Sequence, residues 1–202
     1  MPRALGQIDE RKAEAILSAA AEVFAERGFG ASLEEIARRA GVSKQTVYNQ
    51  FGSKEELLRE AVSRRCSLLT APLADPDAGE RLEDTLTAYA RTLMDMFQSP
   101  ERRAVMRMAI AASGEYPQAA EIVYRAGPYA ARERLAAFLK RESDAGRLAI
   151  PDPVQAAEFF GGMAAGHLQL RGLYDLPREH DDAALDRRAR ECAQRFMKAF
   201  QA

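Results

Sequence analysis

Five polar side chains between residues 44 and 49 have the chemistry that is needed to read base pairs, namely Lys44, Gln45, Thr46, Tyr48 and Asn49. On a helix, Gln45 and Asn49 lie one turn apart and point away from the apolar pair Val47 and Phe51. The side-chain amide of Gln or Asn can donate one hydrogen bond to adenine and accept another from it. Lys can bind guanine or phosphate, and Thr and Tyr hydroxyls can bind phosphate oxygens. The spacing therefore predicts a helix with a polar face that fits the groove of a nucleic acid.

The charge around this segment favours the same partner. The stretch from Ile36 to Lys54 holds no acidic residue and four basic ones, whereas the whole chain has a formal net charge of -1. The basic residues are Arg38, Arg39, Lys44 and Lys54. A helical hairpin with a solvated polar face would show the same short pattern, so the flanking elements have to decide between the two interpretations.

Two capped helices should hold the polar face in place. Ser32 and Glu35 have the spacing of a capping box, and Gly41 supplies the backbone freedom that ends the first helix. Ser43 is placed to cap the second helix, which runs to Phe51. The motif thus spans residues 32–51.

Two longer helices should complete a small core around this motif. Arg11 to Gly28 is amphipathic with a glycine at its end, and Ser53 with Glu56 forms another capping box before an apolar run. Three helices therefore close around one core.

These residues resemble the N-terminal domain of the tetracycline-repressor (TetR) family, through ILSAAAEVFAERGF and SLEEIARRAGVSKQTVYNQFGSKEELL. The resemblance covers residues 9–65 and implies a DNA-binding domain in which Lys54 contacts phosphate at the start of the fourth helix. The candidate DNA-binding residues are Ser32, Arg38, Ser43, Lys44, Gln45, Thr46, Tyr48, Asn49, Gln50 and Lys54. Glu34 departs from the tetracycline repressor, which has a basic residue there, so no base contact is assigned to it.

The rest of the chain, residues 66–202, is helical in pattern after a break at APLADPDAGE. The periodicity predicts helices over 81–98, 100–113, 117–145 and 183–200, and another that starts at Pro153. Gly127 and Pro128 should bend or break the third of these. The fold class is all-α with about nine helices and no convincing strand: a three-helix reader (1–65) followed by a larger ligand-binding and dimerisation domain (66–202).

The second domain resembles that of AefR-like repressors, through segments that include RMAIAASGEYP and HLQLRGLY. The family resemblance implies a small inducer and a homodimer formed by the last two long helices. The segment EFFGGMAAGHLQLRGLY has small residues that would let a partner helix approach, although packing within one chain explains them equally well.

Flexible methionines and aromatic residues in this domain suit an adaptable pocket for an apolar or amphipathic effector, and they would also fill an ordinary core. The pocket candidates are Tyr89, Phe97, Met106, Tyr124, Phe160, Met163 and His167.

Other functional classes receive little support from the sequence. Cys66 and Cys192 suit plain packing in a reducing compartment, although a thiol sensor at Cys66 is an alternative, and His167 and His180 show no metal-ligand spacing. We expect no catalytic set, no metal, no cofactor and no membrane span, and a cytoplasmic location.

The sequence therefore predicts a ligand-released repressor that binds a palindromic operator as a homodimer. An activator of the same family would share every residue discussed. A small-molecule or protein-binding helical module with a vestigial reader is a further alternative, and it would show no salt-dependent DNA binding.

Overall fold

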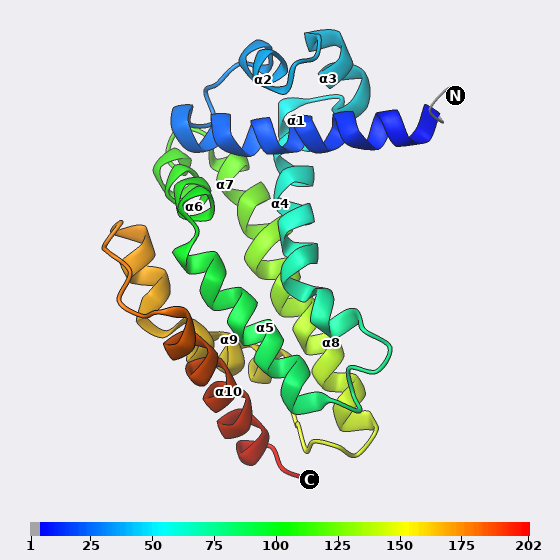
Figure 1. The fold of residues 1–202 in the computed structure, drawn as a ribbon, viewed down its shortest axis with the longest axis vertical. Coiled ribbons are helices and arrows are strands. Elements are labelled where there is room, and N and C mark those ends of the chain that lie inside the picture. Colours follow the sequence, from blue (N-terminus) through cyan, green and yellow to red (C-terminus); the bar gives the residue numbers. More distant parts are fainter. Residues whose placement is uncertain (1–4) are drawn as a thin grey trace. The chain divides into compact units, whose positions relative to one another are not determined.

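Caps and turn glycines set the helix ends in the computed structural model, which describes residues 5–202 of the chain, with side chains from Glu10 onward. The described residues fall into two compact units (Figure 1). The first unit contains the chain up to Arg64 together with Ala104–Ala126, and the second contains Arg65–Arg103 and Gly127–Ala202.

The α-helices are α1 (Leu5–Arg27), α2 (Leu33–Ala40), α3 (Lys44–Phe51), α4 (Lys54–Thr70), α5 (Leu82–Gln98), α6 (Pro100–Ala112), α7 (Pro117–Tyr124), α8 (Ala130–Asp144), α9 (Pro153–Leu173) and α10 (Asp182–Ala199). A 3-10 turn (Ala71–Ala74) follows α4 and a π-turn (Arg125–Tyr129) links α7 to α8. The predicted all-α class is confirmed. The chain is helical without a gap from residue 117 to 144, since the π-turn joins α7 to α8. Counting this stretch as one helix gives nine helices among the described residues.

The first unit is built around the apolar face that the sequence predicts for α1. Ile16, Val23 and Phe24 of α1 are fully buried together with Ile36 of α2 and Leu57 of α4. Removing such side chains from water is the main favourable contribution to folding, roughly 1.5–3 kcal/mol for each. This core therefore fixes the positions from which α2 and α3 project.

Residues of α6 and α7 join the same core, which the sequence did not predict. Met108, Ala119 and Ile122 are buried in one cluster with the α1 and α4 side chains. The first unit is thus made from two separate stretches of chain. Apolar periodicity shows that a helix has a buried face, but it does not show which neighbour covers that face.

The second unit packs α5, α8, α9 and α10 around aromatic side chains. Phe160 of α9 and Phe196 of α10 are buried with their ring centroids 5.1 Å apart at right angles, and Tyr89 of α5 lies 6.0 Å from Phe160. Edge-to-face pairs of this kind add about 0.5–1.5 kcal/mol beyond the burial of their area. These rings hold three helices in one register.

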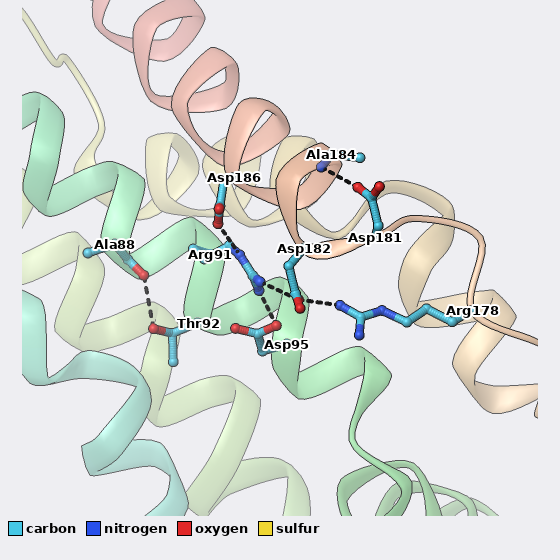
Figure 2. A network of polar contacts seen from close by, with 9 residues as sticks. All are labelled: Ala88, Arg91, Thr92, Asp95, Arg178, Asp181, Asp182, Ala184 and Asp186. Carbon is cyan, nitrogen blue, oxygen red and sulfur yellow. Dashed lines mark hydrogen bonds and ion pairs between the residues drawn. The ribbon is translucent and has the colours of Figure 1, made fainter.

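A cluster of charges fastens α5 to the first turns of α10 (Figure 2). Arg91 donates to Asp186 (2.6 Å) and Asp182 (2.8 Å) and also pairs with Asp95, while Arg178 donates to Asp182 (2.6 Å). The hydrogen bond from Arg178, followed by the charge of Arg178, lowers the pKa of Asp182. The cluster therefore stabilises the antiparallel pairing of α5 and α10 while Asp182 is ionised.

Three features differ from or extend the predicted elements. Helix α1 begins at Leu5 rather than Arg11, since no proline or cap separates the two positions. At Gly127 and Pro128, where a bend or break was predicted, the structure has a π-turn within an uninterrupted helical stretch. Gly166 interrupts the helical backbone of α9 (φ 45°, ψ -133°), a conformation that only glycine adopts readily.

Within residues 5–202, β-pairing is limited to one isolated bridge, between Leu148 and Gln201. In the same range the structure has no helix that is both long and apolar enough to cross a membrane.

Candidate nucleic-acid interface

Hydroxyl caps and one glycine define the turn between α2 and α3. The Ser32 hydroxyl accepts from the Glu35 amide (3.3 Å), and the Ser43 hydroxyl accepts from the Thr46 amide (3.0 Å). Gly41 adopts the left-handed conformation, with φ at 69°. Another residue type would be strained at Gly41, so this position fixes the angle at which α3 leaves α2.

The exposed face of α3 carries two amides that are bonded to each other. Gln45 donates through Nε2 to Oδ1 of Asn49 (2.7 Å), while Val47 on the opposite face is 1% exposed. The bond aligns both side chains along the helix and directs them outward together. Tyr48 lies beside them and is 54% exposed. This face can approach a groove without any rearrangement of the core.

Lys44 is held by an acidic residue of the preceding helix. Its ammonium donates to the carboxylate of Glu34, and both side chains are exposed. The hydrogen bond from Lys44 is the largest cause of the lowered pKa of Glu34. Lys44 therefore faces a carboxylate at the place where the resemblance predicts a base or phosphate contact.

Lys54 ties the start of α4 to the turn between α1 and α2. Its ammonium donates to the carbonyl oxygens of Phe29 (2.7 Å) and Ala31 (3.4 Å) and lies 4.5 Å from the centroid of the Phe29 ring. These contacts stabilise the turn. They also hold the ammonium of Lys54 at the N-terminus of α4, where a phosphate would add to the favourable contacts.

The remaining basic and polar candidates differ in exposure. Arg38 is exposed on α2, whereas Arg39 is bound to both carboxylate oxygens of Glu26 at 2.7 Å. Thr46 is half-buried and bonds the Ser43 hydroxyl, and Gln50 is half-buried. Exposed polar candidates thus gather on the outer face of α2 and α3, while Arg39 has a structural partner.

The seven pocket candidates do not form one group. Tyr89 and Phe160 lie together in the core of the second unit, and Phe97 packs against the same cluster. Met163 and His167 are exposed on α9. The other two, Met106 and Tyr124, belong to the first unit.

The cysteines and histidines show no sign of special chemistry. Both thiols are free and buried, and burial raises the pKa of Cys66 and raises that of Cys192 to about 11. Neither thiol is activated as a nucleophile. Among the described residues, no group of three His, Cys, Asp or Glu side chains could hold a metal ion.

Helices α1, α2 and α3 on one apolar core, a glycine turn between two capped helices and an outward polar face define a helix-turn-helix DNA-binding protein. Residues 16–61 match the family described as bacterial regulatory proteins, tetR family, and residues 84–202 match the AefR-like transcriptional repressor C-terminal domain. The chain belongs to the TetR family and is a DNA-binding transcriptional regulator.

The curated relatives include a transcriptional activator and a transcriptional repressor. The HTH-type transcriptional activator FasR of Mycolicibacterium smegmatis is 45% identical over 64 residues, which are 31% of this chain and 29% of FasR. A transcriptional repressor of Mycobacterium tuberculosis is 35% identical over 85 residues, or 42% of this chain and 45% of the repressor. The chain thus spans less than half the length of these two relatives.

Solved structures match nearly the whole chain. A TetR-family transcriptional regulator from Mesorhizobium loti is 27% identical with a TM-score of 0.75, covering 96% of this chain and 98% of that one. The flavonoid-responsive regulator FrrA is 33% identical with a TM-score of 0.71, covering 95% and 98%.

Proposed function

We propose that this regulator is a repressor that binds a palindromic operator as a homodimer and leaves it when a small effector binds. Residues 1–65 would form the DNA reader and residues 66–202 the effector-binding and dimerisation domain, acting in the cytoplasm. The observation that carries the DNA-binding part is the outward pair of Gln45 and Asn49 on α3. An operator with two-fold symmetry follows from two identical readers.

The α3 face supports reading of adenine in the major groove. With Gln45 Nε2 bonded to Asn49 Oδ1, the pair still has the Gln45 carbonyl as an acceptor and the Asn49 amide as a donor. Adenine presents one acceptor (N7) and one donor (N6) on its major-groove edge, which this pair complements. Arg38, Tyr48 and Lys54 lie on either side along the chain and would contact phosphates.

The exposed surface of α9 supports dimerisation through the last helices. Phe159 is 54% exposed, Leu170 49% and Tyr174 72%. Apart from adjacent residues and the nearby backbone of α9, a Cβ atom added at Gly161 or Gly162 would meet no atom of the described chain within 4 Å. The glycines therefore do not serve the packing within one chain, and they leave room for a second helix to lie close against the apolar side chains.

Activation is the second candidate, because the relative FasR is an activator. An activator and a repressor can share the same reader and differ only in where the operator lies relative to the promoter. The same purified protein therefore serves to test both.

The test is binding of the full chain to fluorescent DNA from the region upstream of its own gene, with a random duplex of equal length as the control. We expect binding by a dimer that prefers the upstream DNA and weakens as salt rises. Transcription from that promoter in vitro then separates repression from activation. Equal binding to both duplexes would refute the proposed operator, and a monomer on DNA would refute the dimer.

A further inference from the structure

A cavity of about 220 Å³ opens in the second unit where α5 meets the end of α9. Its wall contains apolar side chains from both helices and from the α9–α10 loop, together with several nitrogen donors. The wall includes the apolar side chains of Phe97, Leu168 and Leu176 and the donors of Gln98, Arg103 and Arg171. Pockets for drug-sized ligands are usually 300–1,000 Å³, so this cavity suits a smaller molecule.

Two donors in this wall have no acceptor. Gln98 Nε2 and Arg103 Nε are shielded from solvent and make no hydrogen bond to any described residue. A buried donor without an acceptor is destabilising, so such groups are uncommon unless something else satisfies them. Both residues line the cavity, so a bound molecule with acceptor atoms would be a candidate to satisfy them.

The charges in the wall favour a ligand that brings negative charge. Arg103 pairs with Asp175 (3.2 Å) and Arg171 with Glu179 (3.1 Å), while Arg178 lines the cavity as a third cation and is bonded to Asp182 outside the lining. The wall thus holds three guanidinium groups and two carboxylates, and a third carboxylate, that of Asp182, meets Arg178 just outside it. A carboxylate would supply the acceptors that Gln98 Nε2 and Arg103 Nε lack, and guanidinium groups bind such an acceptor more strongly than a neutral one.

The backbone of α9 helps to hold Arg103 in this position. A Cβ atom at Gly172 would lie 2.5 Å from the Phe97 carbonyl oxygen and 2.9 Å from Cδ of Arg103. Only glycine allows this close approach, which stacks the stem of Arg103 against α9. The stem of Arg103, whose Nε lacks an acceptor, is thus held beside the cavity.

The site also lies at a junction along the chain. Gln98 is the last residue of α5 and Arg103 lies in the first turns of α6, whose residues from Ala104 onward belong to the first unit. A ligand that draws these two side chains together would act on a helix that continues into the unit carrying α2 and α3.

We propose that this cavity binds a small carboxylate with an aromatic or aliphatic body, whose oxygens accept hydrogen bonds from Gln98 and Arg103. The apolar body would lie against Phe97, Leu168 and Leu176. The role of this ligand as the effector rests on the proposed function. Binding itself can be measured without DNA.

The probes are benzoate, phenylacetate and hexanoate, each compared with its neutral amide at equal ionic strength, by calorimetry on the full chain. We expect at least one carboxylate to bind about ten-fold or more tightly than its amide. Gln98→Leu and Arg103→Met should each weaken that carboxylate about ten-fold. Gln155→Leu and Arg81→Met are matched controls, since Gln155 is exposed and Arg81 pairs with Asp75 away from the cavity.

The ligand-free melting temperature gives a second readout. Gln98→Leu removes a buried donor without a partner, so we expect no loss of stability, whereas a purely structural Gln98 would destabilise the protein when replaced. Carboxylates that bind no better than their amides, or that bind Gln98→Leu and Arg103→Met as well as the wild type, would overturn the assignment. If the carboxylates fail these tests but DNA binding persists, the proposed function stands without this ligand. If a carboxylate binds but the protein does not bind DNA, the proposed function is refuted instead.

Discussion

Lys44, at the start of α3, donates a hydrogen bond to the carboxylate of Glu34, in the first turn of α2. Both side chains are exposed, and Lys44 precedes Gln45 directly on α3. Glu34 therefore lowers the positive charge around α3 and occupies the ammonium that we propose for a phosphate or guanine contact. If Lys44 contacts DNA as proposed, DNA has to compete with this carboxylate for its ammonium.

Replacing Glu34 should strengthen DNA binding. Glu34→Gln releases Lys44 and removes a negative charge beside it, so we expect DNA to bind about three- to ten-fold more tightly at low salt. The affinity should also fall more steeply as salt rises, by the amount that about one further phosphate contact adds. Binding to operator DNA across a salt series measures both quantities. Glu35→Gln is the matched control, because Glu35 loses the same charge but pairs with Arg27 at 3.6 Å. An equal gain from both variants would show that net charge alone, and not the release of Lys44, is responsible.

Lys54→Met should affect both stability and DNA binding. The variant loses the bonds to Phe29 and Ala31 and the contact with the Phe29 ring, so we expect a loss of about 1–2 kcal/mol in the free energy of unfolding. Affinity should fall by the same factor on operator and on random DNA, with a shallower salt slope, because a phosphate contact carries no sequence information. Denaturant titration and binding on both duplexes measure these effects. A loss confined to the operator would contradict the phosphate role.

The charge cluster of Figure 2 should make the stability of the second unit depend on pH. The pKa of Asp182 is lowered in the folded protein, first by the hydrogen bond from Arg178, so its ionised form is favoured by folding. That contribution is present above the ordinary pKa of 3.8 and is lost as the pH falls through the lowered folded value. We therefore expect Asp182→Asn to melt below the wild type at pH 7 and to approach it toward pH 3. A gap that stays constant over this range would contradict the assignment, and the double variant with Arg178→Met tests whether the two residues are coupled.

The aromatic core of the second unit should be costly to truncate. Phe196 is buried against Phe160 and Phe200, with ring centroids at 5.1 Å and 4.8 Å. Phe196→Ala removes these contacts and leaves a cavity, which we expect to lower the free energy of unfolding by about 3–5 kcal/mol. Phe159→Ala is the control, because Phe159 is 54% exposed in the single chain and should cost far less. Equal losses, measured at protein concentrations low enough to separate folding from association, would contradict the packing described.

Much of the helical fold could be predicted from the sequence because its signals are local. Ser32, Ser43 and Ser53 cap the helices that they were expected to cap, and Pro100 and Pro153 start α6 and α9. Caps and prolines act within one turn, so a short window of sequence contains all the information that they need.

The tertiary partners of polar and apolar side chains could not be predicted in the same way. The pairing of Lys44 with Glu34 depends on the angle between two helices, and Lys54 reaches carbonyl oxygens more than twenty residues away in sequence. Met163 and His167 follow an apolar pattern on α9, yet both are exposed. The sequence could not predict this, because a helix of mixed small and apolar residues does not reveal which face the chain itself covers.

The most direct test of the account is selection of bound duplexes from a random DNA pool by the wild type and by Gln45→Ala and Asn49→Ala. We expect the wild type to enrich one motif with two-fold symmetry, and each variant to lose base preference at the same positions in both half-sites while it still binds DNA. No enrichment by the wild type, or an unchanged motif with both variants, would contradict the assignment of α3 as the element that reads the operator.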